Sequence, residues 1–163
     1  MNGVGTVERI FTAPEAEVEM VEQSDVKAVA GSGLEGDRYF SEIETGTFVT
    51  WDPDEERPNG YDVTLIEREA IDGIEREADV ELSPGEHRRN IITRDAALNH
   101  LVGKRFRVGD AIFQGDRLCE PCGYLQDLIE KDVLEPLAHR GGLRADILES
   151  GRIRSNDEIE PLE

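Results

Sequence analysis

Residues 106–113 read FRVGDAIF, with apolar residues on both sides of a Gly-Asp pair. Apolar residues alternate with arginine ahead of Gly109-Asp110 and resume directly after this pair. Apolar runs on both sides of a two-residue Gly-Asp turn predict two strands joined as a tight β-hairpin. We therefore expect the chain around this hairpin to build a domain rich in strands.

Further short strands are expected on both sides of the hairpin. They are predicted at residues 4–10, 27–30, 61–66, 89–92 and 146–148, and in the tail 151–159 around a turn at 155–157. Helical spacing of apolar residues predicts helices at 67–79 and 124–129, and Thr93 is a plausible N-cap for a third through Leu101. This pattern predicts one α+β domain over residues 1–163, a strand-rich, barrel-like fold with a few short helices.

The composition is that of a globular protein with a core of its own. The 163 residues contain no run of about 18 or more apolar residues, so no membrane span and no membrane partner are expected. The N-terminus shows no signal-peptide pattern, and two cysteines do not make a disulfide framework. We therefore expect a reduced, cytoplasmic protein.

The charge balance is strongly acidic. The chain has 18 basic and 37 acidic residues, a net charge of −19, and its only lysines are Lys27, Lys104 and Lys131. An acidic, lysine-poor surface predicts adaptation to a high-salt cytoplasm, as in a halophilic archaeon. Nucleic acid is not an expected partner, because its phosphates would meet a surface of like charge.

One segment departs from this acidic character. Residues 86–117 hold seven basic and four acidic residues and lead directly to the two cysteines. A local positive field beside a thiol favours the thiolate and attracts anionic ligands. The segment therefore predicts an anion-binding region next to the cysteines.

Both cysteines lie in LCEPCG, at residues 118–123. A Cys-x-x-Cys pair can be structural, a thioredoxin-like redox pair, part of a zinc site, or the source of one thiolate that holds a cofactor metal or carries a persulfide. The redox pair needs a βαβ setting, which is not expected this far along a strand-rich chain. Zinc would need further ligands, and His87, His100 and His139 are not at ligand spacing.

A glycine-rich loop, GSGLEGDR at residues 31–38, is neither a P-loop nor a Rossmann fingerprint. Its GLEGDR, followed by RRNI at 88–91, LVGKRFRVG at 101–109 and LCEPC at 118–122, resembles the ordered motifs of the MOSC family, named for the C-terminal domain of molybdenum cofactor sulfurases. The tail at 140–157 is similar to the family's closing hairpin. The chain is thus identified as a small, stand-alone member of this family.

The resemblance implies a strand-rich, barrel-like fold and one of two roles. Members either bind the molybdenum cofactor (molybdopterin) through a cysteine sulfur or carry sulfur as a persulfide, and some reduce N-hydroxylated compounds. The resemblance matches Cys122 to the molybdenum ligand, and Cys119 is then a neighbour or a resolving thiol.

The same resemblance suggests residues that bind the anionic cofactor. Arg88 and Asn90 would supply a charge-assisted hydrogen bond and a polar contact. Arg38 could serve the same ligand, and Asp37 could orient Arg38 or simply form an ion pair with it.

Three functions remain open. The first is a molybdenum-dependent oxidoreductase that reduces a small-molecule substrate; since the chain has no flavin, haem or Fe–S motif, it would need a separate electron-donor reductase. The second is a sulfur transferase in which Cys122 accepts sulfur from a cysteine desulfurase, and pyridoxal phosphate, a family-level property, would then sit in that partner. A structural or regulatory domain with inert cysteines is a third possibility.

Overall fold

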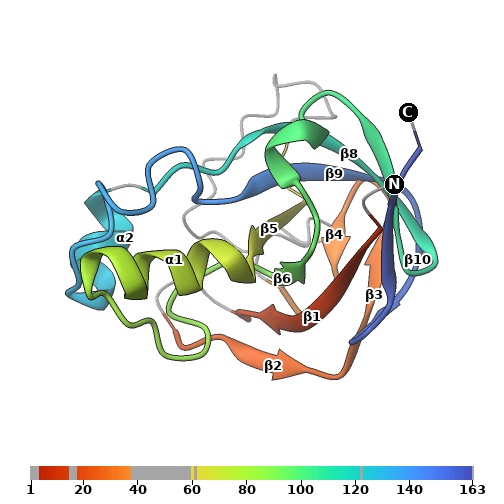
Figure 1. Cartoon of the computed structure of the whole chain (residues 1–163). Helices are drawn as coiled ribbons and strands as arrows, with labels where there is room; N and C mark the ends of the chain where they lie inside the picture. The colour runs from red at the N-terminus through yellow and green to blue at the C-terminus, as the bar shows by residue number, and fades with distance from the viewer. Residues whose placement is uncertain (1–3, 15–17, 38–59, 61, 122, 163) are drawn as a thin grey trace, which may run out of the picture.

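The computed structural model (Figure 1) describes residues 4–14, 18–37, 60, 62–121 and 123–162. Within them, seven strands close a barrel in the order β1 (Gly5–Thr12), β6 (Ile91–Arg94), β5 (Val63–Glu67), β9 (Leu143–Glu149), β8 (Ala111–Leu118), β7 (Arg105–Val108) and β11 (Glu158–Pro161). The pairing of β11 with β1 closes the ring. The expected strand-rich, barrel-like α+β fold is therefore confirmed.

The pairing in this barrel is mixed. Neighbouring strands are antiparallel except β5 and β6, which run parallel and are joined through α1 (Arg68–Ala78). The strand β2 (Val21–Gln23) pairs with the second half of β1. A separate small sheet is formed by β10 (Gly151–Arg154), β3 (Asp25–Val29) and β4 (Gly33–Leu34).

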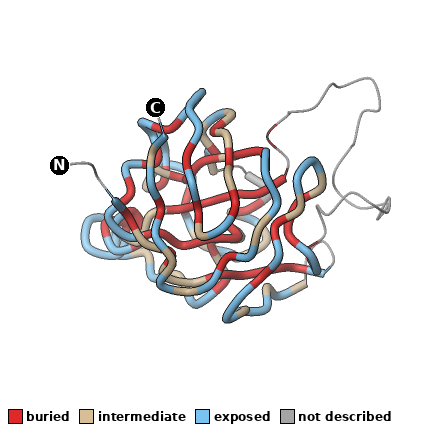
Figure 2. Tube along the Cα trace, turned by 90° about the vertical axis from the view of Figure 1, so that its right-hand side faces the viewer, coloured by how far each residue is buried: buried red, intermediate tan, exposed pale blue. Residues whose placement is uncertain are grey.

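The predicted hairpin lies in the wall of the barrel. Phe106 and Phe113 face each other across β7 and β8, and both are fully buried with ring centroids 5.7 Å apart. At the turn Gly109 has a φ of 57°, a left-handed conformation that glycine adopts without strain. Burial of each of the two phenylalanine side chains stabilises the fold by roughly 1.5–3 kcal/mol. Figure 2 shows buried residues along the segments of chain that cross the inside of the molecule.

A second apolar cluster lies outside the barrel, under the helices. Ile66 and Ile92 point outward from β5 and β6 and pack with Ile71 and Ile74 of α1. Leu125 of α2 (Gly123–Ile129) joins the same cluster. Figure 1 shows α1 and α2 together on one side of the barrel. None of the described helices is long and apolar enough to span a membrane.

The prediction of a helix that begins at Thr93 and runs through Leu101 is wrong. Thr93 belongs to β6, and only a short 3₁₀ helix, η1 (Leu98–Leu101), follows it. The β-branched run at 91–93 pairs with both β1 and β5, and this sheet pairing overrides the capping signal. Asp95 then takes a left-handed φ of 62°, which ends the strand.

The strands and the turn expected in the tail are confirmed as β10, the turn at 155–157 and β11 (Glu158–Pro161), but the two strands do not pair with each other as a hairpin. β10 pairs with β3 in the small sheet, whereas β11 pairs with β7 and β1 in the barrel. The turn between them is held by other segments, because the N–H of Ser155 donates to Ser24 and that of Asn156 donates to Val7. Asn156 has a φ of 76° at the point where the chain changes sheet.

Candidate functional site

The cysteine loop, residues 119–122, connects β8 to α2. Its first residue, Cys119, is 3% exposed, and both its backbone N–H and its carbonyl are hydrogen-bonded. The Cys119 N–H donates to the Gly142 carbonyl at 2.7 Å, and the Cys119 carbonyl accepts from Arg89 Nη2 at 2.9 Å. Cys122 lies outside the described residues.

A second loop, residues 139–142, supports the cysteine loop from the side of β9. A Cβ on Gly141 would lie 2.5 Å from the Cys119 carbonyl oxygen and 2.9 Å from the ring of Pro121, so the contact requires glycine. The Glu120 carboxylate accepts from the His139 backbone N–H at 2.7 Å and lies 3.1 Å from its ring Nδ1. The two loops therefore form one bonded unit.

Arg89 joins this unit to the segment before β6. Its side chain is buried, with 6% of the residue exposed. The guanidinium donates from Nε to Gly141, from Nη1 to His87 and from Nη2 to Cys119, all three acceptors being backbone carbonyls at 2.9–3.1 Å. In the described part of the chain no carboxylate lies within ion-pair distance of Arg89. Sequence reasoning placed Arg89 only in the basic segment.

His87 is a buried, neutral neighbour of Arg89. Its Nδ1 accepts the Arg89 backbone N–H at 2.9 Å, so the ring proton is on Nε2. Nε2 has no hydrogen-bond partner among the described residues, and the ring packs edge-on against Phe11. Burial, reinforced by nearby arginines, lowers the pKa of His87 from 6.5 to about 3. His87 is therefore uncharged at ordinary pH.

Arg88 and Asn90, both predicted cofactor contacts, lie on either side of Arg89. Arg88 is half-buried, has a φ of 60°, and donates from Nη1 to the Val18 carbonyl. Asn90 Oδ1 accepts from the backbone and hydroxyl of Thr64 at 3.0 and 3.1 Å, and Nδ2 donates to the Phe11 carbonyl at 3.1 Å. Asn90 thus links β1 to β5, and its role toward a cofactor stays a prediction.

Of the two predicted residues in the glycine-rich loop, the structure describes only Asp37. Asp37 is 5% exposed, and its Oδ1 accepts the Ala13 backbone N–H at 2.9 Å, just beyond β1. Arg38 lies outside the described residues. The end of β1 and the segment after it therefore bond to three of the predicted residues. Ala13 bonds to Asp37, Phe11 to Asn90, and Val18 to Arg88.

Two more arginines lie beside the cysteine loop, on the outer face of the barrel. Arg117 of β8 and Arg144 of β9 are directly opposite in the antiparallel register. The residues on both sides of Arg144 are core residues, so Arg144 and its cross-strand partner face outward. Arg117 also pairs with Asp116 at 2.5 Å. Sequence reasoning did not single out Arg144, although the apolar alternation around it was the available signal.

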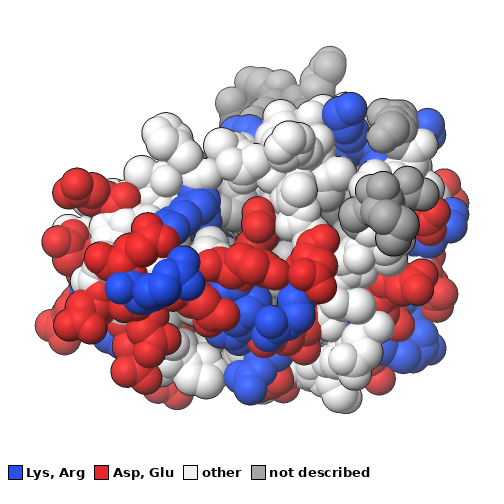
Figure 3. Space-filling view, viewed as in Figure 1, with Lys and Arg blue, Asp and Glu red and all other residues white. Residues whose placement is uncertain are grey.

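We call Arg88, Arg89, Arg117 and Arg144 the arginine group. These residues come from three separate segments that meet at the cysteine loop. On the face shown in Figure 3, carboxylates gather over α1, with arginines between them. The arginine group contrasts with this acidic surface, and within it Arg117 is paired with Asp116.

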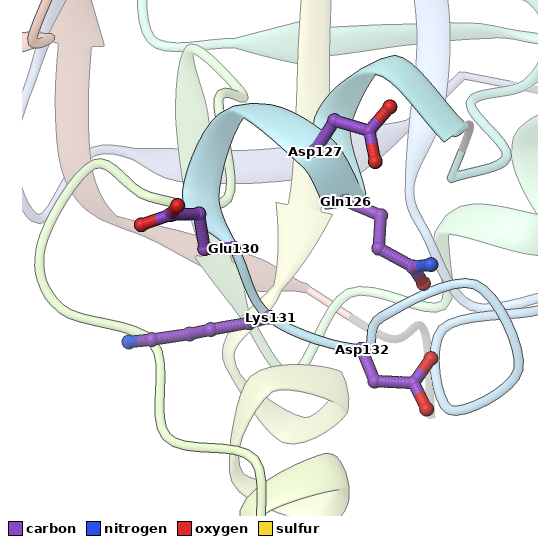
Figure 4. Close-up of a pocket in the computed structure, with 5 residues that line it drawn as sticks. All are labelled: Gln126, Asp127, Glu130, Lys131 and Asp132. Atoms are coloured by element: carbon purple, nitrogen blue, oxygen red, sulfur yellow. The ribbon is translucent and has the colours of Figure 1, made fainter.

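A pocket of about 400 Å³ at the C-terminal end of α2 is not a metal site. It is lined by Gln126, Asp127, Glu130, Lys131 and Asp132. In Figure 4 these side chains spread away from one another, and Lys131 reaches instead to Glu86 at 2.5 Å. No group of three metal-ligating side chains is found among the described residues.

A second pocket, of about 440 Å³, opens next to Arg88. It lies between residues 18–20, residues 83–88 and the end of α2 at Leu128 and Ile129. Its lining combines apolar side chains with charged ones, and its volume is typical of sites for small molecules.

Comparison with known proteins places these features in a family. A family model described as MOSC domain matches residues 53–160. The YuaD protein from Bacillus subtilis is similar in structure, with a TM-score of 0.78 and 16% identity over 99% of this chain and 97% of that chain. YiiM from Geobacillus stearothermophilus gives a TM-score of 0.69 and 12% identity over 98% and 75%. YiiM from Escherichia coli gives 0.64 and 18% over 99% and 69%. At these identities the likeness shows the fold alone. A search of curated proteins finds no match.

Proposed function

The chain belongs to the MOSC domain family, and we propose that it binds the molybdenum cofactor with Cys122 as the protein ligand to the metal. The observation that carries this proposal is the arginine group, which gathers beside the cysteine loop in a protein of net charge −19. A cofactor with an anionic phosphate and a metal that accepts soft sulfur needs such a combination.

The residues present fit this group. Of the carboxylates next to the cysteine loop, Asp116 pairs with Arg117, and Glu120 bonds to the His139 backbone. His87, whose Nδ1 accepts the Arg89 backbone N–H, has a second ring nitrogen, Nε2, that is buried and has no partner among the described residues. This unsatisfied donor would suit an acceptor on a guest.

The chain's own residues would have distinct tasks. Arg88, Arg117 and Arg144 would bind the cofactor's phosphate and exclude cations, and Arg38 would assist with Asp37 holding the loop in place. His87, neutral at the working pH, would donate a hydrogen bond without changing its charge. The pocket beside Arg88 would admit the substrate.

When bound, the cofactor supplies two-electron redox chemistry. Reduction of an N-hydroxylated compound consumes two electrons and two protons, breaks the N–O bond, and releases the amine or imine and one water. Because the chain carries no flavin, haem or Fe–S motif, we propose that a separate reductase delivers the electrons.

The proposal is tested by reconstitution. Purified protein is incubated anaerobically with isolated molybdenum cofactor in molar KCl, since the acidic surface supports work in a high-salt cytoplasm. Oxidation of reduced methyl viologen by an N-hydroxylated base is then followed for the parent, Cys122→Ser and Cys119→Ser. We expect Cys122→Ser to lose at least about a hundredfold in rate, and Cys119→Ser to lose less.

Full activity in Cys122→Ser would contradict the ligand assignment. If the parent takes up no cofactor but gains a persulfide on Cys122 from a cysteine desulfurase, the protein is a sulfur carrier instead, and the pyridoxal phosphate belongs to that desulfurase.

A further inference from the structure

A third pocket, of about 270 Å³, is a groove between η1 and β11. Its buried lining is apolar, with Ala96 4% exposed, Leu101 5% and Ile159 1%. None of the residues that line it belongs to the cysteine loop or to the arginine group. The groove is therefore separate from the residues proposed to hold the cofactor.

Exposed apolar side chains gather next to this groove. Six large apolar side chains of the described residues are exposed, and three of them are Val4 (46%), Val102 (40%) and Leu162 (37%). Val102 and Leu162 directly follow lining residues in the chain, and Val4 precedes the residue that pairs with Ile159. Single exposed apolar side chains are ordinary, but a group of them beside a groove indicates a surface that another molecule covers. We call the groove and these three side chains the η1 face.

The charges of the η1 face are balanced, unlike those of the whole chain. Besides His100, its charged lining residues are one lysine, Lys104, and one aspartate, Asp95. Both are exposed, and neither side chain forms a salt bridge with another described residue. Most of the surface of a chain with net charge −19 repels a second copy, whereas the η1 face offers it apolar side chains and one charge of each sign.

We propose that the η1 face is the contact between two copies of this chain in solution. In a two-fold dimer the same patch meets itself, so a face that combines a groove with exposed apolar side chains beside it can be complementary to itself. Val102 of one copy then lies against the groove of the other, and Lys104 of each copy faces Asp95 of the partner subunit. This inference does not depend on the proposed function.

Salt concentration controls this association. Two acidic copies repel each other over about 10 Å at 0.1 M salt but over only about 3 Å at 1 M. The apolar contact does not need such screening to be favourable. The dimer should therefore form in molar KCl and have a dissociation constant at least about tenfold higher in 0.1 M KCl.

The test is sedimentation velocity of the purified protein over about a hundredfold range of concentration, because a dimer dissociates on dilution. Val102→Asp places a charge in the apolar part of the face. Its matched control is Val21→Asp, the same change at a valine of β2 that is 51% exposed and does not line the groove. Lys104→Glu and Asp95→Lys each reverse one charge of the proposed pair.

We expect a dimer of the parent in molar KCl. Val102→Asp should raise its dissociation constant at least about tenfold, and Val21→Asp should leave it unchanged. Lys104→Glu and Asp95→Lys should each raise it at least about threefold, because like charges then face each other. General repulsion predicts the opposite for Asp95→Lys, which lowers the net negative charge. An equal mixture of these two variants should dimerise as the parent does, since opposite charges then meet at both places.

A parent that stays monomeric at every concentration in molar KCl would overturn the proposal, as would a dimer that Val102→Asp leaves unchanged. A mixture that dimerises no better than the single variants would also overturn it. If Asp95→Lys does not fold, the comparison of Val102→Asp with Val21→Asp decides. Failure of molybdenum binding would refute the proposed function alone, because none of these readouts uses the cofactor.

Discussion

Burial of His87 makes the folded protein sensitive to acid in a way that one substitution should remove. The pKa of His87 falls from 6.5 to about 3 because the ring is desolvated, with Arg89 adding to the effect. Between these values the unfolded chain binds a proton at His87 and the folded protein does not. Stability must therefore fall as the pH falls from about 6.5 toward 3. At pH 5 the loss relative to pH 7 is about 2 kcal/mol.

His87→Asn isolates this contribution. The Asn Oδ1 can accept the Arg89 N–H in place of Nδ1, and the side chain does not titrate. The free energy of unfolding is measured by denaturant titration at pH 7 and at pH 5, at one fixed salt concentration. The variant has a lower stability at pH 7, because a gap remains against Phe11, but its loss on acidification should be about 2 kcal/mol smaller than that of the parent.

The comparison is between the two losses on acidification, because carboxylates titrate in the parent and in His87→Asn alike and cancel in the difference. If parent and His87→Asn lose the same free energy to within about 0.5 kcal/mol, the reasoning about His87 is refuted.

Three further predictions follow from individual contacts and from the surface charge. Asn90→Ala should lower the free energy of unfolding by about 2–4 kcal/mol, because Thr64 and Phe11 lose buried partners; a loss below about 1 kcal/mol in denaturant titration would argue against it. Gly141→Ala should displace the cysteine loop and raise the rate of Cys119 alkylation at least about tenfold; retained protection of Cys119 would show that the contact yields without moving the loop. The Tm should rise by several degrees between about 0.1 and 2 M KCl as repulsion among carboxylates is screened, and a falling Tm would contradict the high-salt interpretation.

The local elements of the fold could be predicted where apolar residues followed a single pattern, either strand-like alternation or helical spacing. The hairpin at 106–113 and the helix after β5 were confirmed because alternation and helical spacing are visible within one window. At Thr93 the prediction failed because pairing with two distant strands outweighed a capping signal. In the tail the strands and the turn were predicted, but their pairing as a hairpin was not found, since β10 and β11 pair with strands of different sheets.

The site divides in a similar way. The cysteine loop and the basic segment before it could be found from composition and spacing. The contacts of Arg89 could not, because their acceptors lie 30 and 52 residues away in the chain and are backbone carbonyls, which carry no residue-specific signal. The position of Arg144 opposite Arg117 follows only from the β8–β9 register, which the sequence does not reveal.

Binding of a molybdenum cofactor through Cys122 is tested by the molybdenum and pterin content, per chain, of the parent and of Cys122→Ser, both purified in high salt from a molybdenum-replete host. We predict close to one molybdenum and one pterin per chain in the parent and a loss of most of both in the variant. No molybdenum in either protein, or equal amounts in both, would contradict it.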